Sequence, residues 1–110
     1  MTSRFALAAA ASLLLASTSG LAQDKAAAES LMKKSGCFKC HSLSAKKDGP
    51  SYASVAEKYK GKADAEQKLY THLTTHPKVK IDGKEEEHAS LKTKDDAEIK
   101  NVVKFILSAQ

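Results

Sequence analysis

The sequence predicts a small all-α domain, and three features of its 110 residues lead to that expectation. Apolar side chains near the C-terminus recur at the spacing i, i+3, i+4, i+7 and i+8, which is typical of a helix packed on one face. These residues are Ile99, Val102, Val103, Ile106 and Leu107. Segments rich in helix formers stop at glycine or proline, as helices commonly do. Strand signals are weak along the whole chain.

The first two helices are expected on either side of a turn. Ala26 to Ser35 is rich in helix formers and stops at Gly36, a residue type that ends helices. Gly49-Pro50 reads as a turn. Ser51 to Tyr59 then forms a short helix with an apolar face, so the two helices are joined by a long loop.

Two further helices are expected in the second half of the chain. Asp64 is the predicted N-cap of a helix with an apolar stripe. The stripe consists of Ala65, Leu69 and Leu73. Pro77 and Gly83 bracket an irregular stretch, and Lys78 to Lys84 is predicted to be a solvated loop. The last helix begins at Asp95 or Asp96.

The N-terminus has the pattern of a secretory signal peptide. Arg4 supplies a positive charge, and Phe5 to Ala16 is an apolar run too short to span a bilayer. Gly20-Leu21-Ala22 places small residues at a cleavage site. We therefore expect residues 1–22 to be removed and residues 23–110 to form one domain in the periplasm, without a membrane span.

The charge balance favours contacts with proteins over contacts with nucleic acid. The chain carries 18 basic and 13 acidic residues, for a formal charge of +5, and every basic residue after Arg4 is lysine. Arginine is the usual reader of phosphates and bases, so its absence argues against a nucleic-acid partner. A lysine excess suits either transient docking to acidic partners or solubility.

One pentapeptide holds both cysteines of the chain: Cys37-Phe38-Lys39-Cys40-His41. The pattern C-x-x-C-H is typical of covalent attachment of a c-type haem, in which the thiols bond the porphyrin and the histidine binds the iron. We therefore expect one haem c, held by Cys37 and Cys40 with His41 as proximal ligand. Such a cofactor would also help stabilise so short a chain.

Two other uses of the cysteine pair are open on sequence grounds. Cys37, Cys40 and His41 with another histidine would suit zinc, although the second ligand pair usual in structural zinc sites is not evident. A thioredoxin-like site is disfavoured because no βαβ pattern surrounds the motif.

With these features in order, the chain resembles a small bacterial class I cytochrome c over its whole expected mature length. The resemblance implies terminal helices that cross at Gly36, where only hydrogen fits between the backbones, and Phe105 on a C-terminal helix packed against the first. It implies short helices and loops around one covalent haem. It also implies that the carbonyl of Pro50 accepts a hydrogen bond from the proximal imidazole of His41.

The sequence departs from this family at the distal ligand, which is normally a methionine shortly before the last helix. Its only methionines are Met1, in the expected signal, and Met32, which precedes the motif and is predicted to be a core residue. His88 stands seven residues before Asp95, about where the family's methionine lies. We therefore expect bis-histidine ligation by His41 and His88.

Alternatives for the sixth position are open. His76, in a loop before Pro77, is the second candidate, whereas His72 on the third helix is interpreted as a surface or packing residue. A lysine ligand or an open site are further possibilities.

The expected function is one-electron transport, not enzyme catalysis, since no catalytic constellation is evident. The expected partners are periplasmic or membrane-associated redox proteins. The protein is expected to be a monomer that docks to them through lysines beside an exposed haem edge, such as Lys39, Lys46 and Lys47. The competing function is a ligand-binding or sensing haem protein with a vacant or labile sixth site.

Overall fold

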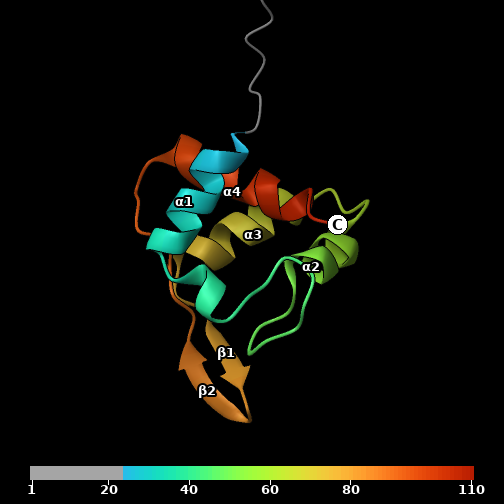
Figure 1. Ribbon diagram of the computed structural model, residues 1–110, viewed down its shortest axis with the longest axis vertical. Coiled ribbons are helices and arrows are strands. Elements are labelled where there is room, and N and C mark those ends of the chain that lie inside the picture. The colour runs from blue at the N-terminus through green and yellow to red at the C-terminus, as the bar shows by residue number, and fades with distance from the viewer. Residues whose placement is uncertain (1–23) are drawn as a thin grey trace, which may run out of the picture.

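The structure is a computed structural model that describes residues 24–110. The expected signal peptide, residues 1–22, lies outside the described residues. Four helices and one small hairpin follow in order: α1 (Lys25–Lys34), α2 (Tyr52–Tyr59), α3 (Ala65–Thr74), β1 (Lys78–Ile81), β2 (Lys84–Glu87) and α4 (Asp96–Leu107). Figure 1 shows the helices gathered into one body from which the hairpin projects. The predicted all-α class is confirmed, with the hairpin as an addition.

Helix α4 is the centre of the hydrophobic core, because α1, α2 and α3 all pack against it. Met32 of α1 and Val102 of α4 are fully buried, each with 0% of its surface exposed. Phe105 is buried in the same core. The start of α1 is tied to α4 by a reciprocal pair, in which Asp24 N–H donates to Asn101 Oδ1 at 2.9 Å and Asn101 Nδ2 donates to the Asp24 carbonyl at 2.8 Å. The predicted packing of the terminal helices is therefore present.

The helix ends follow local capping chemistry. Asp95 caps α4 by accepting a hydrogen bond from Glu98 N–H at 2.9 Å, and Ser51 caps α2 through Ser54 N–H at 3.1 Å. Asp64 precedes α3 as predicted, but its side chain makes no capping hydrogen bond and pairs instead with Lys68 at 3.1 Å. Asp64 is therefore the N-cap residue of α3 as predicted, but without a capping hydrogen bond from its side chain.

Gly36 ends α1 for a conformational reason. Its φ of +78° lies in the left-handed region, where glycine is favoured after a helix. A Cβ built on Gly36 would meet only the Lys39 side chain, at 3.8 Å. The expectation that Gly36 sits at a tight crossing of the terminal helices is therefore wrong, and its backbone torsion explains the glycine.

The stretch predicted to be a solvated loop, Lys78 to Lys84, belongs to an antiparallel hairpin. β1 and β2 pair with Lys78 opposite Glu87 and Ile81 opposite Lys84. The connecting residues Asp82 and Gly83 both have positive φ, at +50° and +79°. That combination fits a two-residue primed turn, for which Asp-Gly is a preferred sequence.

No helix within residues 24–110 is long and apolar enough to cross a membrane.

Candidate functional site

The two cysteines lie in a tight turn that directly follows α1. A 3₁₀ turn spans Cys37–Lys39, and the carbonyl of Cys37 accepts hydrogen bonds from Cys40 N–H at 3.2 Å and from His41 N–H at 3.0 Å. Both thiols are unpaired and half-buried. Burial raises the pKa of the Cys37 thiol. The motif thus forms one compact unit, with both thiols and the imidazole on a few residues of fixed backbone.

The imidazole of His41 is held in one orientation by the loop that follows it. Its Nδ1 lies 2.7 Å from the carbonyl oxygen of Pro50, so Nδ1–H donates and Nε2 is left free to bind a metal. Gly49 N–H donates to the Cys40 carbonyl at 2.7 Å, which closes the loop over the ring. A Cβ at Gly49 would lie 2.7 Å from His41 Nδ1, so only glycine fits beside the ring.

Tyr52 packs against the ring of His41. Its ring stacks on the His41 ring with centroids 4.9 Å apart and planes 27° apart, and it meets Phe38 edge to face at 6.1 Å. Tyr52 is buried, and burial together with the neighbouring Cys37 raises the pKa of its hydroxyl. From the sequence, Tyr52 was expected only as part of the short helix over Ser51 to Tyr59, and no local signal placed it beside His41.

His88 lies close to His41. The centroids of the two imidazole rings are 6.0 Å apart, with planes tilted by 52°. The backbone of His88 is anchored by its N–H, which donates to the Pro77 carbonyl at 2.8 Å. Its Nδ1 is buried and has no hydrogen-bond partner within residues 24–110. Burial, together with the nearby His72, lowers the pKa of His88 and so favours the neutral imidazole, the form that binds metals.

A third histidine, His72 of α3, belongs to the same cluster. Its ring centroid is 4.4 Å from that of His88. Burial is the main cause that lowers the pKa of His72, and the proximity of His41 adds to it. Of the two interpretations of His72, as a surface or as a packing residue, the structure supports packing, because its ring is half-buried against that of His88. The available signal was its place beside Leu69 and Leu73 on the apolar stripe of α3.

His76, the second candidate for the sixth position, is exposed. Its backbone N–H donates to Ser90 Oγ at 3.3 Å, and it lines a surface hollow of about 580 Å³ with Tyr70 and Leu91. The three predicted lysines, Lys39, Lys46 and Lys47, are all exposed, and Lys47 Nζ also donates to the Phe38 carbonyl at 2.8 Å. The structure therefore gathers His41, His72 and His88 and leaves His76 at the surface.

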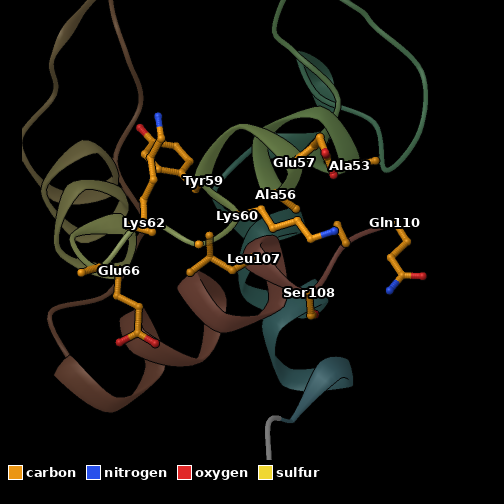
Figure 2. Close-up of a pocket in the computed structure, with 14 residues that line it drawn as sticks. Ala53, Ala56, Glu57, Tyr59, Lys60, Lys62, Glu66, Leu107, Ser108 and Gln110 are labelled. Carbon is orange, nitrogen blue, oxygen red and sulfur yellow. The ribbon is translucent and has the colours of Figure 1, made fainter.

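A larger hollow, of about 880 Å³, lies between α2 and the C-terminal end of α4. Figure 2 shows its lining, which includes Tyr59, Lys62 and Leu107. None of the cysteines and histidines described above borders it. This hollow is therefore separate from the candidate site, although it is the larger of the two hollows.

The residues present fit a metal held between two imidazoles. A metal–imidazole bond is about 2.0 Å long and the ring centre lies about 1 Å beyond the bonded nitrogen, so two rings that would hold one ion have centres no more than about 6 Å apart. The His41–His88 separation of 6.0 Å agrees. A buried Nδ1 without a protein partner on His88 is a further sign that the ring serves a bound group. Within residues 24–110 no group of three or more Cys, His, Asp or Glu side chains is arranged to hold a metal by itself, so the zinc alternative gains no support.

A helical shell around a C-x-x-C-H turn, with an imidazole oriented by a proline carbonyl, defines a small class I cytochrome c. The Cytochrome c family profile matches residues 25–110, and the chain belongs to that family. Its cofactor is one covalently bound haem c.

Solved structures agree in fold. The class 1 cytochrome MtoD from Sideroxydans lithotrophicus ES-1 is 54% identical, with a TM-score of 0.76 over 79% of this chain and 97% of that one. Wild-type cytochrome c552 from Nitrosomonas europaea is 26% identical, with a TM-score of 0.59 over 74% of this chain and 99% of that one.

Among curated proteins, cytochrome c-552 of Hydrogenobacter thermophilus is 54% identical over 47% of this chain and 53% of that protein. Cytochrome c-551 of Pseudomonas aeruginosa is 46% identical over 37% of this chain and 39% of that protein. The chain thus matches about half the length, or less, of these curated relatives.

Proposed function

We propose that the protein carries single electrons on a haem c bonded through Cys37 and Cys40, with His41 as proximal and His88 as distal ligand. The observation that carries the proposal is the pair of neighbouring imidazoles, whose ring centres are 6.0 Å apart. Haem supplies an iron that alternates between the ferrous and ferric states. Because His41 and His88 would both hold the iron, the site would favour electron transfer over binding of external ligands.

The surrounding residues orient the imidazole of His41 and favour the neutral form of His88. Pro50 fixes the tautomer of His41 by accepting its Nδ1–H at 2.7 Å. That hydrogen bond makes the ring a stronger donor, which stabilises the ferric state. Burial keeps the pKa of His88 low, so the ring stays in its ligand form. Two imidazoles therefore favour a lower reduction potential than an imidazole and a thioether would give at equal burial.

Export and docking complete the proposal. The expected signal peptide in residues 1–22 directs the chain to the periplasm. The exposed side chains of Lys39 and Lys46 flank the cysteine turn and its loop, where they attract acidic redox partners by long-range electrostatics. Docking through these lysines should weaken with ionic strength, whereas the optical spectrum should not change.

The test is a set of ferric and ferrous spectra for four proteins: wild type, His88→Ala, His76→Ala and the double variant His72→Phe/His88→Ala. We expect a low-spin ferric spectrum without the methionine-to-iron charge-transfer band in wild type and in His76→Ala. His88→Ala should turn high-spin and bind carbon monoxide in the ferrous state. The double variant is included because His72 lies close enough to His88 to replace it.

Each other outcome has a definite meaning. If His88→Ala stays low-spin and the double variant turns high-spin, His72 replaces the missing ligand in the single variant. The double variant then supports His88 as the ligand in the wild type. If both keep the wild-type spectrum, His88 is not the ligand. A high-spin, carbon-monoxide-binding wild type would instead support a sensing protein, and a purified chain with the mass of bare polypeptide would overturn the proposal.

A further inference from the structure

The hairpin between α3 and α4 ends directly at His88. The ladder of β1 and β2 runs from Ile81 opposite Lys84 to Lys78 opposite Glu87. One step further, His88 N–H donates to the Pro77 carbonyl at 2.8 Å, so His88 is the next position of the same ladder. The backbone that carries His88 is therefore an extension of the hairpin.

The two faces of the hairpin differ in character. Successive residues of a strand point to opposite faces, so His88 shares a face with Glu86 and Lys84, and with their partners Val79 and Ile81. Val79 and Ile81 are the half-buried residues of β1. The opposite face holds four exposed charged residues, two lysines from β1 and two glutamates from β2: Lys78, Lys80, Glu85 and Glu87. One face thus carries His88 together with the two half-buried apolar residues of β1, and the other face carries only exposed charged residues.

Register decides on which face His88 lies. A slip of one residue moves every side chain of a strand to the other face, and in a two-residue hairpin the turn fixes the register. The turn here needs positive φ at Asp82 and Gly83, and register places Lys80 opposite Glu85 and Lys78 opposite Glu87, pairs of opposite charge. Both features favour the observed register.

We propose that the hairpin Lys78–Glu87 is a positioning device that holds the His88 imidazole toward His41 by fixing the strand register, with Gly83 as its main determinant. This inference rests on the proposed ligation by His88. A weakened turn leaves His88 chemically intact. The His88 ring then spends more time away from the site. An external ligand then competes better for the vacated position.

The test measures the carbon monoxide affinity of the ferrous holoprotein for Gly83→Val. Valine at φ +79° is strained, yet a Cβ there meets nothing within 4 Å, so the change acts on the turn alone. Such strain corresponds to about a tenfold change in an equilibrium constant, and we expect the apparent affinity to rise about tenfold. Gly83→Asn, which tolerates positive φ, should stay close to wild type. Gly61→Val, with the same strain at φ +73° in a different loop, should also stay close to wild type.

A charge pair provides a second route that leaves the turn intact. Lys80→Glu places like charges opposite each other on the solvent face and should raise the affinity in the same direction. The exchange Lys80→Glu/Glu85→Lys should restore it.

The outcomes separate this inference from the ligand assignment. If His88→Ala opens the site but Gly83→Val and Lys80→Glu both bind carbon monoxide as wild type does, the positioning role is overturned and the ligand stands. If His88→Ala and His72→Phe/His88→Ala both leave the site closed, the ligand assignment itself fails. Should Gly83→Val not accumulate, Lys80→Glu and its charge exchange decide the question alone.

Discussion

Gly49→Ala should disturb the proximal side of the site through a single added methyl group. The Cβ would lie 2.7 Å from His41 Nδ1 and 3.0 Å from its Nε2, whereas ordinary contact begins at 3.4 Å. The ring atom nearest to this Cβ is Cε1, which lies closer still than Nδ1, so the ring must retreat by at least about 0.7 Å. Because φ of Gly49 is outside the left-handed region, the alanine adds no backbone strain.

The retreat acts on the hydrogen bond between His41 Nδ1 and the Pro50 carbonyl, which is 2.7 Å long. A hydrogen bond of this kind is worth about 1 kcal/mol net. If all of it is expressed in the ferric state, its loss corresponds to about 40 mV for a one-electron couple. The bond strengthens the ring as a donor, so we expect the reduction potential of Gly49→Ala to rise, by up to about 40 mV.

Spectroelectrochemical titration of the holoprotein measures this shift. Gly61→Ala is the matched control, because its alanine is strained at φ +73° but meets nothing within 4 Å. The control should lose stability while keeping the wild-type potential and spectrum. A Gly49→Ala protein with wild-type potential and spectrum would refute the view that Gly49 makes room for the imidazole.

Three further predictions concern stability, each measured by guanidinium unfolding of the holoprotein. Met32→Ala removes a fully buried side chain and should cost about 2–5 kcal/mol, and a cost below about 1 kcal/mol would mean that the core closes over the gap. Asp95→Ala removes the N-cap of α4 and should cost about 0.5–2 kcal/mol, whereas Asp95→Asn should keep most of the cap. Tyr70→Phe removes a 2.9 Å hydrogen bond to the Asp96 carboxylate, whose pKa is lowered first by Lys100 and then by Tyr70. The stability from that lowered pKa is present above the ordinary aspartate pKa of about 3.9 and is lost as pH falls through the folded-state value, so the difference between Tyr70→Phe and wild type should vanish in acid. A difference that persists in acid would mean that packing is responsible.

The helices were predictable because their signals are local. α1 and α4 begin and end within a residue or so of the expected positions, since an aspartate cap, an apolar stripe and Gly36 all act over a few residues. Asp64 shows the limit of such signals. Its residue type suits a cap, but the side chain meets Lys68 one turn later, and a sequence cannot rank the two contacts.

The hairpin was not predicted because its strands are only four residues long and consist mostly of charged residues. β2 is exposed along its whole length, so no apolar run marks it. The usable signal was Asp82-Gly83 beside the alternating Val79 and Ile81. Reading that signal would also have given the face on which His88 lies.

The site itself was partly predictable. The C-x-x-C-H motif and the missing methionine pointed to His41 and His88, and the structure brings those rings to 6.0 Å. His72 and Tyr52 could not be assigned in the same way, because nothing in linear spacing says that α3 meets the residue after β2 or that α2 lies under His41. Those contacts depend on how three helices pack around α4.

A histidine in the distal position places a demand on the backbone that a methionine does not. A thioether on three rotatable bonds adapts to a loosely placed loop, whereas a planar ring with two torsions binds only if its backbone is already in place. The segment around His88 meets that demand with four hydrogen bonds. They join His88 N–H to the Pro77 carbonyl at 2.8 Å, His76 N–H to Ser90 Oγ at 3.3 Å, Leu91 N–H to the Leu73 carbonyl at 3.0 Å and Lys92 N–H to Ser35 Oγ at 2.9 Å. Two of these tie the segment to α3 and to the end of α1, the helix that leads into the cysteine turn. The hairpin and its anchors therefore connect the two proposed ligands through the protein, which would keep their spacing constant while the charge on the iron changes.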